Sequence, residues 1–254
     1  MGVVIGVASD RLALLLVTLC MLLKGTAALT GRTVVLVRHG ISEMNVALAR
    51  QPWGSPGFVD PDIRDAPLTP AGVAGAKALT DSVGREFLDV DLIVSSPLTR
   101  ALETADAVWD VALRRRVPAV ALALAAERNY LSSDIGTPKT VLERSAVGRR
   151  FNFDYLPRES WWWVPDGHVG SGYAPPPADD WRPEGAYCSA GEPEADFKRR
   201  MERLLQWLQA RDEQTIALVC HWGVIMALTG ESFKNCEVRR VPVEDLGLRD
   251  DVAY

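Results

Sequence analysis

Short apolar runs that alternate with helical segments constrain the fold of this chain more than any other feature of its sequence. The run at 33–37 (TVVLV) is made of β-branched residues and Leu, and a second apolar run lies at 90–96 (VDLIVSS). Two further candidates lie at 117–127 and 215–223. Short apolar runs of this kind are typical of strands that are buried inside a sheet.

Helical segments are predicted between these strands. Thr69-Pro70 is a cap followed by Pro at the first helical position, and it predicts a helix to about Phe87. Ser96-Pro97 predicts the start of a second helix, and a third is predicted over about 194–211. The alternation predicts an α/β fold, a three-layer α/β/α sandwich with a mainly parallel central sheet. An irregular cap insert rich in Pro, Gly, Asp and Trp is predicted at about 128–192. The apolar positions of the second and third helices are Leu98, Leu102, Ala105 and Trp109, then Phe197, Met201, Leu204, Leu205 and Leu208.

Composition excludes several classes of protein. The chain has 254 residues, of which 48% are hydrophobic, enough for one large domain or two small ones. A net charge of −5 and a pI near 5.3 argue against a general nucleic-acid binder, so no nucleic acid partner is expected. The four cysteines form no CxxC pair, and no HExxH motif is present, so no metal site is predicted.

The amino terminus has the pattern of a targeting segment. An apolar stretch at 12–23 follows Arg11 and precedes small residues at 25–28, which is typical of a secretory signal peptide. Residues 1–28 are therefore predicted to be a signal peptide or an N-terminal anchor, and residues 29–254 the folded domain. This predicts a secretory or organellar location, with no stable membrane partner unless 12–23 remain as an anchor. Asp10 and Lys24 do not fit the pattern, so a surface helix in a cytoplasmic protein stays an alternative.

Charged residues follow the predicted strands at the points where they end. Arg38 and His39 follow the first strand, His221 ends another, and Glu127 ends a third. Arg100 lies in the first turn of the helix after 90–96, where free N–H groups already favour an anion. Parallel neighbouring strands would bring all five groups to one edge of the sheet. Two guanidinium groups are suited to a phosphoryl group, an imidazole can attack phosphorus, and a carboxylic acid can protonate the leaving oxygen.

Four separated motifs resemble the histidine phosphatase superfamily, also called the phosphoglycerate mutase-like family. They are LVRHGISEMN (36–45), SSPLTRALETA (95–105), Glu127 and CHWG (220–223), and the resemblance covers about residues 33–230. It implies that His39 is the phosphorylated nucleophile and Glu127 the proton donor, with no cofactor. The remaining implied residues bind the phosphoryl group or the substrate: Arg38, Asn45, Arg100, His221, Trp222 and Gly223. Trp222 departs from the family, which usually has a small residue there, and it either narrows the pocket or points away.

Three functions are compatible with this resemblance. A phosphatase that hydrolyses the phosphomonoester of a small molecule or a phosphoprotein is favoured, because the segments at 51–67 and 165–193 have the composition of mobile loops that admit water. A cofactor-dependent mutase is the alternative, since ERNY (127–130) resembles the mutase segment with the acid and Arg149-Arg150 would imitate its carboxylate clamp. A non-catalytic phospholigand-binding protein is the third.

Two features of the insert have simpler interpretations. The tryptophans of SWWWVP (160–165) and Trp181 are predicted to pack the insert. If the insert covers the site, one of them would contact the substrate together with Arg149, Arg150 or Arg158. His168 is predicted to lie in a loop.

Overall fold

The computed structural model describes residues 31–163 and 191–249, and the fold considered below belongs to the unit Thr33–Tyr254. The predicted targeting segment, His168 and Trp181 lie outside the described residues. None of the helices in the described ranges has both the length and the apolar character needed to span a bilayer.

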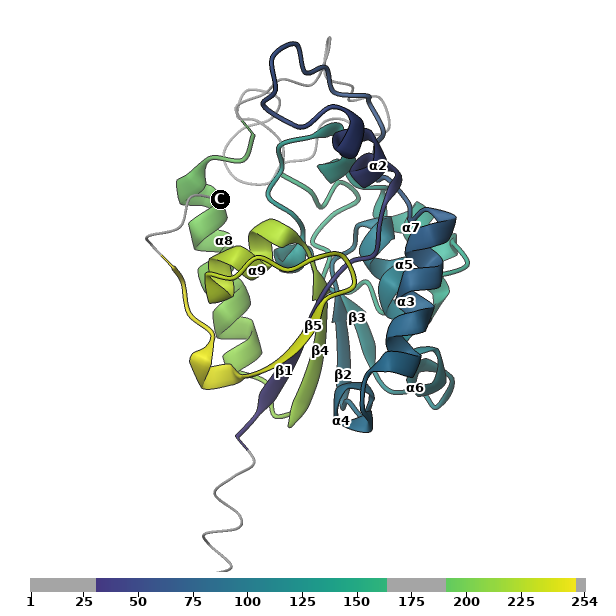
Figure 1. Ribbon diagram of the computed structural model, residues 1–254. Helices are drawn as coiled ribbons and strands as arrows, with labels where there is room; N and C mark the ends of the chain where they lie inside the picture. The colour runs from purple at the N-terminus through teal and green to yellow at the C-terminus, as the bar shows by residue number, and fades with distance from the viewer. Residues whose placement is uncertain (1–30, 164–190, 250–254) are drawn as a thin grey trace, which may run out of the picture. The chain divides into compact units, whose positions relative to one another are not determined.

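A five-stranded sheet forms the centre of the domain, in the order β3-β2-β4-β1-β5 (Figure 1). Four strands are parallel, and β5 pairs antiparallel with β1 at one edge. The predicted mainly parallel sheet is therefore confirmed. The sequence did not predict β5, because its two arginines interrupt the apolar run that marks the inner strands. The strands are β1 (Thr33–Arg38), β2 (Leu92–Ser95), β3 (Ala119–Ala121), β4 (Thr215–Cys220) and β5 (Val238–Pro242).

Helices cover both faces of the sheet, so the three-layer α/β/α architecture is confirmed. Alternate residues of β1 belong to different apolar clusters. Val35 and Val37 pack in the cluster that includes α3 and α5, whereas Val34 and Leu36 pack in the cluster that includes α8 and α9. The helices are α2 (Glu43–Arg50), α3 (Pro70–Ser82), α4 (Arg85–Leu88), α5 (Thr99–Val108), α6 (Asp110–Arg114), α7 (Lys139–Arg144), α8 (Glu194–Gln209) and α9 (Trp222–Thr229).

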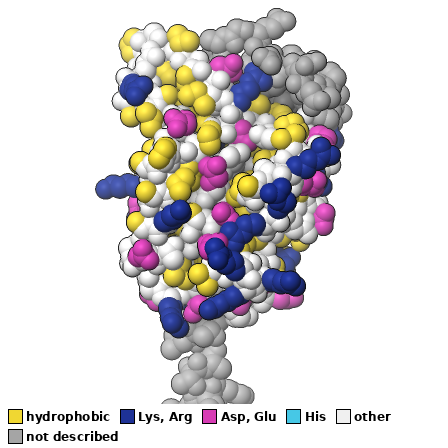
Figure 2. Space-filling view, turned by 90° about the vertical axis from the view of Figure 1, so that its right-hand side faces the viewer, with side chains coloured by type: hydrophobic (Ala, Val, Ile, Leu, Met, Phe, Trp, Pro, Cys, Tyr) yellow, Lys and Arg dark blue, Asp and Glu magenta, His cyan; other side chains and the backbone are white. Residues whose placement is uncertain are grey.

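One face of the domain has the mixture of charged and apolar side chains that is usual for a surface in contact with water. Figure 2 shows basic and acidic side chains interspersed on the face that it presents, with small hydrophobic patches between them. Asp110 on α6, for example, forms ion pairs with Arg114 and Arg150. Exposed pairs of this kind contribute at most about 1 kcal/mol each to stability, so the two buried clusters hold the fold together.

Three predicted elements have different bounds in the structure. The helix from Pro70 ends at Ser82 rather than near Phe87, because Val83 is extended and Gly84 starts the separate short helix α4. The candidate strand at 117–127 is reduced to β3, because the alanine-rich stretch after it has no β-branched residue and forms a 3₁₀ turn at Ala123–Ala125. Leu98, not Ser96, is the N-cap residue of α5.

One end of the 51–67 segment is more firmly anchored than its composition suggested. Asp60 accepts hydrogen bonds from the backbone and hydroxyl of Ser132, and Asp65 accepts hydrogen bonds from the backbone and hydroxyl of Thr99. Both carboxylates are buried, so this end of the 51–67 segment is fixed to the domain. Trp161 and Trp162 are buried in the core, which confirms the packing interpretation for these two residues.

Candidate active site

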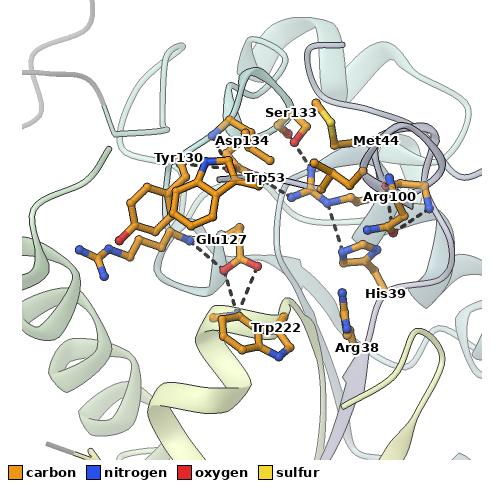
Figure 3. Close-up of a pocket in the computed structure, with 16 residues that line it drawn as sticks. Arg38, His39, Met44, Trp53, Arg100, Glu127, Tyr130, Ser133, Asp134 and Trp222 are labelled. Atoms are coloured by element: carbon orange, nitrogen blue, oxygen red, sulfur yellow. Dashed lines mark hydrogen bonds and ion pairs between the residues drawn. The ribbon is translucent and has the colours of Figure 1, made fainter. Parts of the chain in front are cut away.

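A cavity of about 220 Å³ lies at the carboxyl ends of the parallel strands (Figure 3). β1 delivers Arg38 and His39, the first turn of α5 delivers Arg100, and the turn after β3 delivers Glu127. The structure therefore brings all five groups predicted at the strand ends to this edge of the sheet: four of them line the cavity, and the ring of the fifth, His221, lies 5.0 Å from that of His39. The residues that line the cavity are Arg38, His39, Ser42, Met44, Asn45, Leu48, Trp53, Arg100, Glu127, Arg128, Tyr130, Leu131, Ser133, Asp134, Trp222 and Gly223.

His39 is held as a neutral imidazole in one tautomer. Its Nδ1 atom lies 2.7 Å from the carbonyl oxygen of Gly40, which can only accept, so Nδ1 carries the proton. Nε2 is then unprotonated, and its lone pair accepts a hydrogen bond from Nε of Arg100 at 3.3 Å. Burial and the nearby charges of Arg100 and Arg38 hold the pKa of His39 well below its usual range. Nε2 is thus available as a nucleophile at neutral pH.

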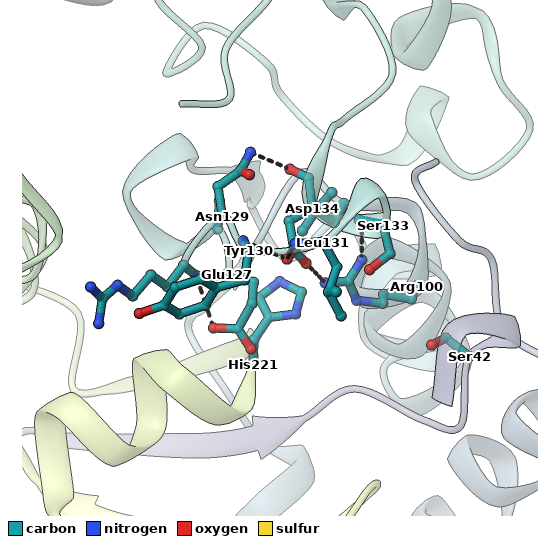
Figure 4. A network of polar contacts seen from close by, with 12 residues as sticks. Ser42, Arg100, Glu127, Asn129, Tyr130, Leu131, Ser133, Asp134 and His221 are labelled. Atoms are coloured by element: carbon teal, nitrogen blue, oxygen red, sulfur yellow. Dashed lines mark hydrogen bonds and ion pairs between the residues drawn. The ribbon is translucent and has the colours of Figure 1, made fainter. Parts of the chain in front are cut away.

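Arg100 is oriented by the loop that follows β3 (Figure 4). Its guanidinium donates to the carbonyl oxygen of Ser133 at 2.6 Å and forms an ion pair with Asp134 at 2.9 Å. Both members of the pair are about 95% buried, at 4% and 5% side-chain exposure. Burial raises the pKa of Asp134, and the charge of Arg100 opposes that rise. This arrangement leaves Nε of Arg100 pointing at His39.

Asp134 is a charged residue of the site that sequence reasoning missed. Its second carboxylate oxygen accepts hydrogen bonds from the backbone N–H groups of Tyr130 and Leu131, at 3.1 and 3.0 Å. The carboxylate therefore closes a tight turn and orients Arg100 at the same time. Its position in an irregular segment gave no periodicity or motif from which this could be predicted.

Arg38 and Glu127 flank the cavity on the other side of His39. Arg38 donates to the carbonyl oxygen of Phe233 at 2.6 Å, while its Nε is buried and has no partner in the described part of the chain. The Glu127 carboxylate accepts hydrogen bonds from the backbone of Arg128 at 2.9 Å and of Gly223 at 3.1 Å. Burial raises the pKa of Glu127, and the negative charge of Asp134 raises it further. The raised pKa favours a carboxyl group that can carry a proton.

His221 lies behind the cavity and does not line it. The side chain is fully buried, and its ring centroid is 5.0 Å from that of His39. Its Nε2 lies 2.7 Å from the hydroxyl of Ser96, and its Nδ1 is buried without a hydrogen-bond partner among the described residues. Burial is the main cause that lowers the pKa of His221 well below its usual range. Two neutral imidazoles therefore lie side by side at the base of the site.

The other predicted substrate-binding residues also lie in the site. Asn45 lines the cavity, and its side-chain oxygen accepts hydrogen bonds from the backbone of Ser42 and from Asn235. Trp222 lines the cavity as well and does not point away, with its indole N–H donating to Ser232 at 2.9 Å. Gly223 contributes the backbone N–H that holds Glu127.

The predicted carboxylate clamp is not part of this cavity. Arg150 forms ion pairs with Asp106 and Asp110, and Arg149 donates to the carbonyl oxygen of Arg144. Neither arginine lines the cavity, so the expectation that the pair would imitate a mutase clamp is wrong. Within the described ranges, no three His, Cys, Asp or Glu side chains are grouped so that they could hold a metal ion.

The arrangement of a buried histidine after the first strand, two arginines and a carboxyl group can be compared with known proteins. Residues 34–146 match the family model of the histidine phosphatase superfamily (branch 1). Over these residues the chain is similar to the histidine phosphatase superfamily, which confirms the resemblance that the sequence indicated. Members of this superfamily are phosphatases or mutases, so we expect this chain to be an enzyme.

Individual members are only distantly similar to this chain. A 2,3-bisphosphoglycerate-dependent phosphoglycerate mutase from Mesorhizobium japonicum is 31% identical over 131 residues, which is 50% of this chain and 58% of the mutase. The ecdysone phosphate phosphatase from Bombix mori, solved with tungstate, has the same fold with a TM-score of 0.51 and 16% identity, covering 86% of this chain and 92% of that one. The alpha-ribazole phosphatase from Shigella flexneri has a TM-score of 0.50 and 20% identity, covering 85% and 94%.

Proposed function

We propose that this protein is a phosphatase that hydrolyses phosphomonoesters through a phosphohistidine on His39, with Glu127 as the proton donor. The observation that supports this most directly is the fixed tautomer of His39. Nδ1 donates to the carbonyl oxygen of Gly40, so the nucleophilic lone pair is on Nε2. That lone pair points toward Nε of Arg100, which also lines the cavity. No proton has to be removed before the attack.

The chemistry follows from the positions of these groups. Nε2 of His39 forms a bond to phosphorus while the bond between phosphorus and the ester oxygen breaks, and Glu127 gives its proton to the leaving oxygen. Arg38 and Arg100 stabilise the negative charge of the transferred phosphoryl group. In the second step water attacks the phosphohistidine, Glu127 takes the proton from that water, and inorganic phosphate leaves. Glu127 therefore recovers in the second step the proton that it donates in the first.

A mutase is the second candidate, and the similarity to the phosphoglycerate mutase of Mesorhizobium japonicum favours it. A mutase that acts on a phosphoglycerate also needs a cation for the substrate's carboxylate, and the arginines expected in that role lie outside the cavity. We therefore rank hydrolysis first. A mutase would convert 3-phosphoglycerate to 2-phosphoglycerate with a bisphosphorylated primer, whereas we expect free phosphate at most.

Replacement of His39 with Ala tests the nucleophile. We expect His39→Ala to abolish turnover of 4-nitrophenyl phosphate, and the acid-labile phosphoenzyme that rapid quenching traps in the unchanged protein to disappear. Circular dichroism serves as the control that the variant is folded. Turnover at the level of the unchanged protein would remove His39 from this role.

A further inference from the structure

The part of the cavity beyond the phosphoryl-binding groups is apolar. Met44 and Leu48 contribute one wall from α2, and Leu131 contributes another from the loop after β3. Trp222 forms the side next to Glu127. We call these residues, together with the aromatic pair described next, the apolar wall.

Trp53 and Tyr130 form the aromatic part of the apolar wall. Their ring centroids are 5.3 Å apart, and the rings are tilted by 41° (Figure 3). Trp53 is 58% exposed although it is a large apolar side chain, and it lies against a cavity rather than in the core. A ring or chain that enters the cavity can cover this exposed indole surface, and the burial would favour binding.

The charges of the cavity are concentrated at its phosphoryl-binding end. Apart from Arg38 and Arg100, the cationic side chain among the described lining residues is Arg128. Arg128 is buried, donates to the carbonyl oxygen of Glu192 and packs 4.6 Å from the centroid of the Tyr130 ring. Its guanidinium is therefore engaged in the structure, and the apolar wall offers no charge to a second anionic group of the substrate.

From this distribution we infer that the physiological substrate is a phosphomonoester with an uncharged, apolar leaving group, a hydrophobic alcohol or phenol. The inference rests on the proposed function, since it assigns the phosphoryl group to Arg38 and Arg100. Phosphorylated sugars and phosphoglycerates would leave the apolar wall exposed and place hydroxyl or carboxylate groups against it without partners.

Non-hydrolysable phosphonates test the inference without any turnover. Binding of ethylphosphonate, hexylphosphonate and 5-carboxypentylphosphonate to the full-length protein would be measured by calorimetry. Each buried methylene strengthens binding up to about fourfold, so the four extra methylenes of the hexyl chain should lower the Kd by about 10- to 200-fold. The carboxylate of 5-carboxypentylphosphonate should remove most of that gain. Equal Kd values for the ethyl and hexyl compounds, or tighter binding of the carboxylate compound, would overturn the inference.

Two tryptophan variants localise the effect. Trp53→Ala should weaken hexylphosphonate about 5- to 10-fold and ethylphosphonate less, because the short chain reaches less of the apolar wall. Trp207→Ala is the matched control: Trp207 lies on α8, packs edge-on against Tyr155 and does not line the cavity. The same loss in both variants would show that the hexyl chain does not contact Trp53.

Hydrolysis of ethyl phosphate and hexyl phosphate separates this inference from the proposed function. These two esters have leaving groups of similar acidity, so their ratio of kcat/KM measures contacts with the chain. A ratio of at least 10 in favour of the hexyl ester supports the inference, and a ratio near one contradicts it. If no ester is hydrolysed, 4-nitrophenyl phosphate included, the phosphatase proposal fails, and the phosphonate Kd values still decide whether the cavity selects apolar groups.

Discussion

Replacement of Gly223 with Ala should displace the proton donor without unfolding the protein. A Cβ atom built on Gly223 lies 2.5 Å from Oε1 of Glu127, and the next atom outside that carboxyl group is 3.9 Å away. Ordinary contact begins at 3.4 Å, so the carboxylate must move by at least about 0.9 Å, which is the difference between 3.4 and 2.5 Å. Glu127 is a flexible side chain at the edge of a cavity, so it can move where backbone could not.

The size of the effect follows from the role of Glu127. A misplacement of about 1 Å can cost about 10²-fold in rate, and a general acid contributes about 10²- to 10⁴-fold. We therefore expect kcat/KM for an alkyl phosphate to fall about 100-fold in Gly223→Ala. The loss on 4-nitrophenyl phosphate should stay below about tenfold, because that leaving group hardly needs a proton. Glu127→Gln should show the same difference between the two substrates.

Stability measurements separate displacement from misfolding. Gly223 lies in the first turn of α9, where Ala is the better helix former, so the free energy of unfolding should change by less than about 1 kcal/mol. Gly75→Ala in α3 is the matched control, since its Cβ would meet only Cys236 Sγ at an ordinary 3.6 Å. Alkyl phosphate turnover in Gly223→Ala equal to that of the Gly75 control would refute the assignment of Glu127 as the acid.

Two further predictions concern buried charges. Asp134→Asn breaks the buried pair with Arg100, which should cost about 3 kcal/mol and lower the Tm by about 6–12 °C in thermal denaturation. The substitution should also move the alkaline limb of the pH profile of kcat/KM to lower pH, because the negative charge of Asp134 raises the pKa of Glu127. An alkaline limb that does not move would show that the ionisation of Glu127 does not determine it. His39 and His221 have pKa values lowered by burial, so the unfolded chain binds more protons, and the free energy of unfolding should fall as the pH drops below about 6.5. Denaturant titrations at pH 7.5 and 5.5 test this, and His39→Gln should shrink the difference; equal stability of the unchanged protein at the two pH values would contradict it.

The sequence by itself determined the fold class and four groups that line the cavity: Arg38, His39, Arg100 and Glu127. The run at 34–37 (VVLV) is apolar and buried at every position, which is typical of a strand that lies between two layers of helices. The direction of parallel strands then places the residues that follow them at one edge of the sheet. Arg38 and His39 could be located in this way because their position depends on local pattern and strand direction alone.

Tertiary structure decided how these groups are oriented and what surrounds them. Arg100 and Asp134 are 34 residues apart, and His221 and Ser96 are 125 apart. The anchoring of Asp60 by Ser132 also depends on a contact across the fold. A hydrogen bond or ion pair between distant residues leaves no periodicity in the chain, because the partners are chosen by where the packed helices and strands bring them. The tautomer of His39, the orientation of Arg100 and the apolar wall of the cavity therefore became visible only in the folded protein.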